Sequence, residues 1–261
     1  MNRFLAALLL ALAACSGGGG GGSPNSGNPP PPPPPPPPAS AQVTLLFMGN
    51  SHTSVNNLPG MVAAMVRVAR PGMTVLATEA PGWMFLDERS VNVPSIELLR
   101  ERNWTYVVLQ AQKYSSSGAF DYPIDGAVSL VRKAREQHAL PVLFPEWPRR
   151  GIDETQRIYD LHVSIAREAP ACVAPVPQAW DLAAARHPAL VLHNADGNHS
   201  APAGAFLAAL VIANTMTGLA PDQVPVLPGF SVDPETQALL RAIAAETVLV
   251  YRPRQWCPAD A

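Results

Sequence analysis

The feature that most constrains the fold is a regular alternation, from residue 41 onward, of short apolar segments with segments of helical periodicity. In the first helical segment, for example, apolar residues recur at Leu58, Met61, Val62 and Met65. Continuous apolar strands separated by helices predict a parallel sheet that is buried on both faces, and hence an α/β fold. The predicted strands are Val43–Met48, Thr74–Glu79, Thr105–Gln110, Pro141–Pro145 and Ala171–Pro175.

Some helix boundaries are also predicted from local signals. Asp153 with Gln156 resembles a capping box and predicts a helix that continues to Glu168. Ser200 is expected to cap a very apolar helix that ends near Gly218. Further helices are expected at residues 96–102 and after the Asp-Pro pair at 233–234.

The charge balance argues against a nucleic-acid partner. The chain has 18 Lys and Arg against 20 Asp and Glu, a formal net charge of −2, and it shows no basic run. No stretch of 18 apolar residues occurs, so the sequence predicts no membrane-spanning helix.

Residues 1–14 have the pattern of a secretory signal peptide. Arg3 is the charged residue, and Phe4–Ala14 is an apolar run too short to span a bilayer. The run ends in Leu12-Ala13-Ala14-Cys15, which resembles the lipobox of bacterial lipoproteins, whose cysteine is lipidated. Ser16 after the cysteine resembles lipoproteins that are sorted to the outer membrane. An ordinary secretory signal with a chance cysteine is the alternative.

Residues 15–40 predict a tether between the lipid and a folded domain. The segment contains the glycine run Gly17–Gly22 and the proline run Pro29–Pro38. In polyproline II geometry the prolines would extend roughly 30 Å, at ~3.1 Å each. We therefore expect a signal peptide (1–14), a lipidated Cys15 with its tether (15–40) and one domain (41–261). The membrane would be a partner through Cys15, in the bacterial envelope.

Two cysteines, Cys172 and Cys257, remain for the domain. An oxidising periplasm would permit a disulfide between them, and two separate buried thiols are the alternative. The sequence leaves both open.

The loop after the first strand is the first candidate for chemistry, because ligands bind at the carboxyl ends of parallel strands. It reads Met48-Gly49-Asn50-Ser51-His52. Such a turn can expose the Ser51 hydroxyl beside a helix N-terminus, where backbone N–H groups favour negative charge. A capped helix start without further function is the alternative.

The second candidate is the polar segment around Asp196 and His199, which lie three positions apart with Gly197 between them. In a tight loop the carboxylate can bind imidazole Nδ1 and leave Nε2 free to take a proton. A polar turn that caps a helix is the alternative.

Together these two loops resemble the SGNH hydrolases, also called GDSL esterases. Gly49-Asn50-Ser51 matches the first block of that family, with Asn50 in place of the usual Asp, and Asp196 and His199 match the last block. The resemblance covers about residues 43–218. It implies a flavodoxin-like three-layer α/β/α sandwich with a mainly five-stranded parallel sheet, and no metal or organic cofactor. It also implies that Ser51 is the nucleophile and that His199 is a base oriented by Asp196.

The two middle blocks match less well. Gly82 is the candidate for the glycine whose N–H enters the oxyanion hole beside that of Ser51. The third block is usually Gly-x-Asn-Asp, and Gln112 falls at its Asn position; Gln110 is the choice if the loop is shifted. The resemblance implies an amide donor to the oxyanion there, worth roughly 3–4 kcal/mol in comparable sites.

Other residues near these loops allow more than one interpretation. His52 adjoins Ser51 and could serve as a base in place of His199. His193 could join Asp196 and His199 as metal ligands. Glu146-Trp147 follows the fourth strand and lines a substrate pocket or covers the core.

The sequence therefore predicts a lipid-anchored serine esterase that hydrolyses or transfers acyl groups. Its substrate would be a small-molecule or glycan ester, with acetyl esters on envelope or extracellular glycans as a reasonable class. The alternative is a non-catalytic glycan-binding or scaffold lipoprotein on the same fold, supported mainly by the weak third block.

Overall fold

The computed structural model describes residues 41–261; the expected signal peptide, Cys15 and tether lie outside the described residues. Strands and helices alternate along the described chain, with two short 3-10 helices, η1 and η2. The elements are β1 (Val43–Met48), α1 (Ser51–Ser54), η1 (Val55–Asn57), α2 (Leu58–Ala69), β2 (Val75–Glu79), α3 (Leu86–Val91), α4 (Val93–Arg100), β3 (Tyr106–Leu109), α5 (Asp125–Glu136), β4 (Leu140–Leu143), α6 (Thr155–Glu168), β5 (Cys172–Val173), α7 (Val176–Arg186), α8 (Pro202–Thr217), η2 (Pro221–Gln223) and α9 (Pro234–Val250).

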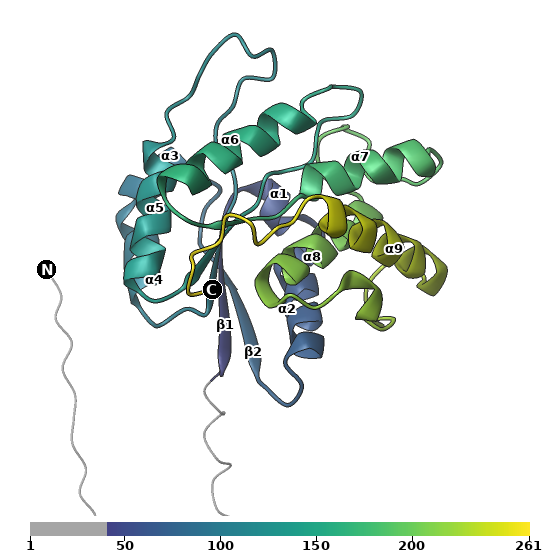
Figure 1. Cartoon of the computed structure of the whole chain (residues 1–261), viewed down its shortest axis with the longest axis horizontal. Helices are drawn as coiled ribbons and strands as arrows, with labels where there is room; N and C mark the ends of the chain where they lie inside the picture. The colour runs from purple at the N-terminus through teal and green to yellow at the C-terminus, as the bar shows by residue number, and fades with distance from the viewer. Residues whose placement is uncertain (1–40) are drawn as a thin grey trace, which may run out of the picture. The chain divides into compact units, whose positions relative to one another are not determined.

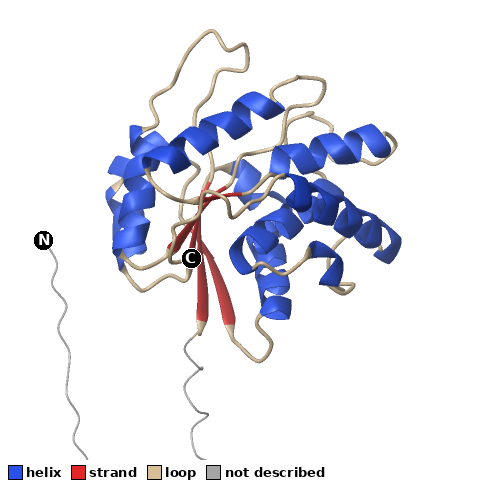
Figure 2. Ribbon diagram, in the orientation of Figure 1, coloured by secondary structure: helices blue, strands red, loops and turns tan. Residues whose placement is uncertain are grey.

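The strands form a five-stranded sheet in the order β2-β1-β3-β4-β5, and each neighbouring pair is parallel. Figure 2 shows the strands in red, with helices on both sides of them. This order is that of flavodoxin-like sheets. It reverses direction between β1 and β3, so the loops after these two strands flank the switch point where ligands bind in such folds. The predicted α/β fold with a parallel sheet of five strands is confirmed.

Helices cover both faces of the sheet and make three layers (Figure 1). Successive residues of β1 point to opposite faces. Leu45 and Phe47 pack with α2, α7, α8 and α9, whereas Leu46 and Met48 pack with α3, α4, α5 and α6. All four side chains are fully buried. Because both faces are covered, the strands are continuous apolar runs rather than alternating ones.

Helix α8 is apolar on all sides because α2, α7 and α9 pack around it. Every residue from Gly204 to Met216 is buried. Within residues 41–261, no helix has both the length and the apolar character that a bilayer crossing needs.

The predicted capping box at the start of α6 is not formed. The helix begins at Thr155, and Glu154, rather than Asp153, is the residue before it. The Glu154 side chain makes no cap; it accepts from the Arg149 N–H over 2.8 Å. The carboxylate before the helix thus bonds to a residue five positions earlier instead of capping the helix.

One further helix prediction is wrong, and one helix has no prediction. Ser200 does not cap α8, which begins at Pro202; it is fully buried and forms a β-bridge with His193. Helix α3 is not predicted from the sequence, because its six residues are too few to show an apolar period.

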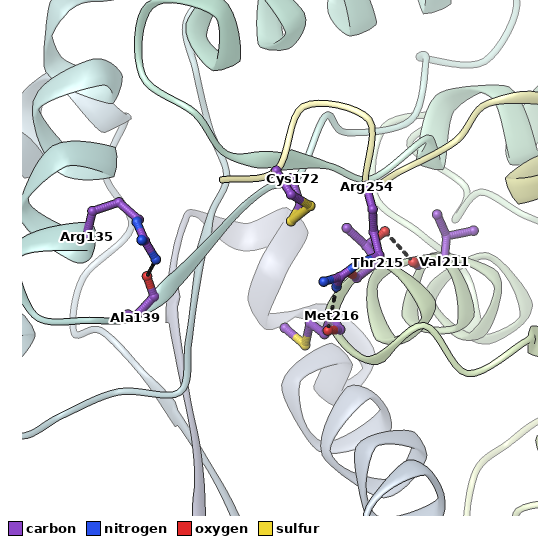
Figure 3. The surroundings of a disulfide bond; sticks show 8 residues. Arg135, Ala139, Cys172, Val211, Thr215, Met216 and Arg254 are labelled. Carbon is purple, nitrogen blue, oxygen red and sulfur yellow. Dashed lines mark hydrogen bonds between the residues drawn. A yellow bond between two sulfur atoms is a disulfide. The ribbon is translucent and has the colours of Figure 1, made fainter. Parts of the chain in front are cut away.

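A disulfide joins Cys172 of β5 to Cys257 (Figure 3), which decides between the two alternatives for these cysteines. The segment after α9 lies along the free edge of β5, where the Val173 N–H donates to the Pro253 carbonyl over 3.1 Å. Arg254 in this segment donates to two carbonyls in the last turn of α8. The C-terminal segment therefore covers the edge of the sheet next to β5.

Candidate active site

The loop after β1 turns directly into α1 and makes Ser51 the first residue of that helix. Asn50 caps the helix, because its side chain accepts from the His52 N–H over 3.0 Å. Its carbonyl accepts from the N–H of Thr53 and of Ser54. These bonds leave the Ser51 N–H as the one N–H of this turn without an acceptor in residues 41–261.

The structure brings Ser51, His199 and Asp196 together, although 148 positions separate the serine from the histidine. Ser51 Oγ lies 2.8 Å from His199 Nε2, and His199 Nδ1 lies 2.6 Å from Asp196 Oδ2. With the proton on Nδ1, the imidazole donates to the carboxylate and accepts from the serine hydroxyl. This is the geometry of a nucleophile, a base and an orienting acid.

Asp196 is held by its own loop. Its Oδ1 accepts from the N–H of Asn198 over 2.9 Å and from the N–H of His199 over 3.0 Å. Gly197 takes a positive φ of 68° that allows this tight turn. The hydrogen bond from the His199 imidazole, followed by these two N–H groups, holds the pKa of Asp196 well below its usual range. The carboxylate therefore stays ionised beside the imidazole.

The loop that carries His199 is held on both sides by side chains from other elements. Trp147 Nε1 donates to the Asn198 carbonyl over 2.8 Å, and Asn56 Nδ2 donates to the Ser200 carbonyl over 2.7 Å. Trp147 is only 1% exposed, so it covers the core. Asn56 has a φ of 60°, a conformation that Asn tolerates better than most residues. Asn56, which follows Ser51 in the sequence, thus helps to position the loop that carries His199.

His52 is not placed as the base. Its ring lies between those of His199 and Trp147, with centroids 5.2 and 5.1 Å apart. His199, and not His52, contacts the Ser51 hydroxyl. Burial, followed by repulsion from His199, lowers the pKa of His52 to about 4. His52 is therefore a neutral ring that packs against the base.

The amide of Gln112, the predicted oxyanion donor, is bonded within its own loop in the structure. Gln112 Nε2 donates to the carbonyls of Lys113 and Pro123, over 3.1 Å each, so both amide hydrogens are used within the loop after β3. Gly82, the other predicted donor, has a φ of 75°. Its N–H has no acceptor in the part of the chain that the structure describes.

Gln110, the alternative in the third block, lies behind the nucleophile loop. Its Oε1 accepts from the Asn50 N–H over 3.0 Å and from Thr53 Oγ1 over 2.9 Å. A Cβ at Gly49 would lie only 2.5 Å from this oxygen, so the close approach requires glycine. Gln110 Nε2 donates to Glu146 Oε2 over 2.6 Å.

Glu146 is a buried carboxyl group that accepts from Gln110 behind the nucleophile loop. Burial raises its pKa to about 7, against the opposite effect of the hydrogen bond from Gln110. Repulsion from Glu154 raises the pKa further, and Arg149 lowers it.

Arg89 of α3 makes contacts beneath the site that the sequence does not predict. It is fully buried, and its Nη2 donates to the carbonyls of Gly49 and Gly82 over 2.8 and 2.7 Å. No local pattern signals it, since α3 itself is too short to predict.

Among residues 41–261, His193 does not join Asp196 and His199 in a set of metal ligands. His193 Nε2 pairs with the Pro148 carbonyl over 2.8 Å. Within residues 41–261, no group of three or more His, Cys, Asp or Glu side chains is arranged to hold a metal ion.

Comparisons with solved structures agree with the fold and with the SGNH/GDSL resemblance. A protein from Slackia heliotrinireducens described as an SGNH hydrolase is 26% identical, with a TM-score of 0.52 over 67% of this chain and 98% of that one. A DUF4886 family protein from Bacteroides uniformis is 17% identical, with a TM-score of 0.58 over 81% and 96% of the two chains, and shows a shared fold. No family model and no curated protein matches the chain. The resemblance to the SGNH/GDSL superfamily is confirmed, which supports a hydrolytic enzyme.

Proposed function

We propose that this chain of the SGNH/GDSL superfamily is a serine esterase in which Ser51 is the nucleophile, His199 the general base and Asp196 the residue that orients the base. One observation carries the proposal: Ser51 Oγ, the His199 imidazole and the Asp196 carboxylate are joined by hydrogen bonds of 2.8 and 2.6 Å.

The reaction begins when Ser51 Oγ attacks the ester carbonyl carbon. His199 Nε2 takes the hydroxyl proton, and Asp196 stabilises the imidazolium that forms. The imidazolium then gives the proton to the leaving alcohol as the tetrahedral intermediate collapses to an acyl-serine. Water hydrolyses this ester by the same steps, whereas attack by a sugar hydroxyl transfers the acyl group. The chemistry needs no metal or organic cofactor.

The negative charge of the tetrahedral intermediate would rest on the backbone N–H groups of Ser51 and Gly82. Ser51 lies at the first position of α1, and its N–H has no acceptor among residues 41–261. Backbone donors of this kind stabilise the transition state more than the substrate, because the oxygen becomes charged only there.

Esters on glycans are the proposed substrate class. A cavity of about 880 Å³ adjoins the loop that carries Asp196, and His193 and Ala195 contribute to its wall. Arg150 and Asp181 offer it charged groups, and Trp180 an aromatic one. Ser51, Gly82 and His199 do not line this cavity, so we assign to it only the larger alcohol part of the ester, beyond the reacting carbonyl.

A lipid anchor at Cys15, outside the described residues, is part of the proposal. It would hold the protein in the bacterial envelope, at the outer membrane. Cys15→Ala is expected to release the chain from membranes or block its maturation, measured by fractionation of cells. Unchanged membrane association of this variant would contradict the anchor without touching the esterase proposal.

The esterase proposal is tested by labelling with a fluorophosphonate probe, alongside turnover of activated esters and acetylated sugars. Wild type should be labelled at Ser51, whereas Ser51→Ala should be unlabelled and inactive. A folded wild-type protein that takes no label and turns over no ester would instead favour the non-catalytic glycan-binding or scaffold protein.

A further inference from the structure

One buried side chain ties together the two backbone segments that would hold the oxyanion. Besides its bonds to the carbonyls of Gly49 and Gly82, Arg89 donates through Nη1 to the Pro81 carbonyl over 3.4 Å and to Ser95 Oγ over 3.0 Å. The Pro81 carbonyl belongs to the same peptide group as the Gly82 N–H. A cation on the carbonyl side polarises that peptide and makes its N–H a stronger donor.

Arg89 is an unusual residue to bury here, because no carboxylate in residues 41–261 lies within ion-pair distance of it. A fully buried guanidinium stays charged and is costly to desolvate unless its hydrogen bonds and opposite charges compensate it. Its direct acceptors are neutral oxygens of backbone and serine.

The charge of Glu79 favours the charged form of Arg89. A series of hydrogen bonds also links Arg89 to a buried carboxyl group. The Gly49 carbonyl, which accepts from Arg89, shares its peptide group with the Asn50 N–H. That N–H donates to Gln110 Oε1 over 3.0 Å, and Gln110 Nε2 donates to Glu146 Oε2 over 2.6 Å. The series of hydrogen bonds therefore runs from Arg89 through the Gly49–Asn50 peptide group and Gln110 to Glu146.

We propose that Arg89, Gln110 and Glu146 form one positioning relay that holds the Ser51 and Gly82 N–H groups in place for the oxyanion. The relay rests on the proposed esterase function. It takes the place of the third-block amide that the family supplies directly, since the Gln112 amide is occupied elsewhere. Each dipole in the chain is aligned with the next, so the bonds strengthen one another in the low dielectric of the interior.

The relay is tested by exchanging two of its side chains. Gln110→Glu keeps an acceptor for Asn50 and Thr53 but places a second carboxylate against Glu146. The double variant Gln110→Glu/Glu146→Gln restores one donor and one acceptor between these positions, and leaves one carboxylate in the relay. Gln178→Glu is the matched control, because Gln178 is a buried glutamine on α7 with no hydrogen bond to the relay.

Gln110→Glu is expected to lower kcat by ~10²-fold with little change in KM, and the double variant to recover at least ~10-fold of that loss. The control should keep wild-type kcat. Affinity for a boronic acid that forms a tetrahedral adduct with Ser51 should fall in step with kcat. A Gln110→Glu variant with wild-type kcat, or a double variant no faster than Gln110→Glu, would overturn the relay.

If Gln110→Glu does not fold, the Arg89→Lys variant tests the relay instead. Lysine keeps the charge but cannot reach several carbonyls with a planar fork, so kcat should fall by ~10-fold at nearly constant KM. Wild-type kcat in this variant would contradict the relay. Labelling of wild type at Ser51 is measured first: its absence overturns the proposed function and the relay together. Labelling with unchanged kcat in the variants overturns the relay alone.

Discussion

The two sides of Ser51 are built in different ways. On one side, the base and its carboxylate lie in a partly exposed loop, with side-chain exposures of 28% for His199 and 49% for Asp196, and their functional atoms face the serine directly. On the other side, the polar side chains of Arg89 and Gln110 are completely buried and face backbone groups. Side chains would move the proton, whereas backbone N–H groups would hold the oxyanion.

This difference decides how each side fails when it is changed. Loss of a side chain that transfers a proton removes the reaction step itself. Loss of a buried positioning group leaves the N–H donors present but poorly aimed, so a graded loss of rate follows.

The largest effect is expected on the proton-transfer side. Ser51→Ala and His199→Ala should each lower kcat by roughly 10⁴-fold or more, because nucleophile and base act as a unit. The double variant should be scarcely slower than either single one. Steady-state turnover of an activated ester, with circular dichroism to confirm folding, provides the measurement. Near-normal turnover in Ser51→Ala would mean that Ser51 is not the nucleophile, and the two sides of Ser51 would then have no catalytic meaning.

A smaller effect is expected on the oxyanion side, and it separates two neighbouring glutamines. Gln110→Ala should lower kcat by ~10²-fold because Asn50 and Thr53 lose their common acceptor. Gln112→Ala should stay within about 3-fold of wild type, since its amide serves only the loop after β3. A larger loss in Gln112→Ala than in Gln110→Ala would mean that the Gln112 amide donates directly to the oxyanion.

A still smaller effect tests how firmly the base loop is held. Asn56→Gly keeps the freedom to adopt a positive φ but removes the donor to the Ser200 carbonyl. Trp147→Phe likewise removes the donor to the Asn198 carbonyl and keeps an aromatic ring. Each should lower kcat by about 3-fold to 10-fold, the equivalent of one hydrogen bond. A loss as large as that of His199→Ala would mean that the loop does not fold without these contacts.

The buried Glu146 should also affect stability, and the sign of that effect follows from its pKa. The pKa is raised from 4.5 to about 7, so between these values the unfolded chain ionises while the folded chain keeps the proton. The contribution of Glu146 to the free energy of unfolding therefore falls as pH rises from about 4.5 to 7. Urea unfolding should show Glu146→Gln gaining stability relative to wild type over this range. A difference that is constant with pH would contradict the raised pKa.

The sequence predicts the proton-transfer side well because its signals are local. Asp196 and His199 lie three positions apart in one loop, and Ser51 follows a strand that is recognisable from its apolar run. The parallel sheet is predictable for the same reason, since each strand carries its own signal.

The oxyanion side depends on contacts between distant segments. Arg89 meets Gly49 across 40 positions, and Gln110 meets Glu146 across 36. A glutamine side chain can bond to several partners, so its position in the sequence does not reveal which of them it binds. The failed capping box at Asp153 has a different, local cause. The helix begins at Thr155, and the carboxylate of Glu154 before it accepts from Arg149, five positions earlier.

The most direct test of the two-sided account is a crystal structure of the wild-type domain with a phosphonate or boronate adduct. The account predicts a covalent bond to Ser51 Oγ, with the oxyanion oxygen at about 2.7–3.1 Å from the N–H nitrogens of Ser51 and Gly82. It also predicts that Gln112 Nε2 still donates to the carbonyls of Lys113 and Pro123. An adduct oxygen bound by the Gln112 amide, or an adduct on a residue other than Ser51, would contradict it.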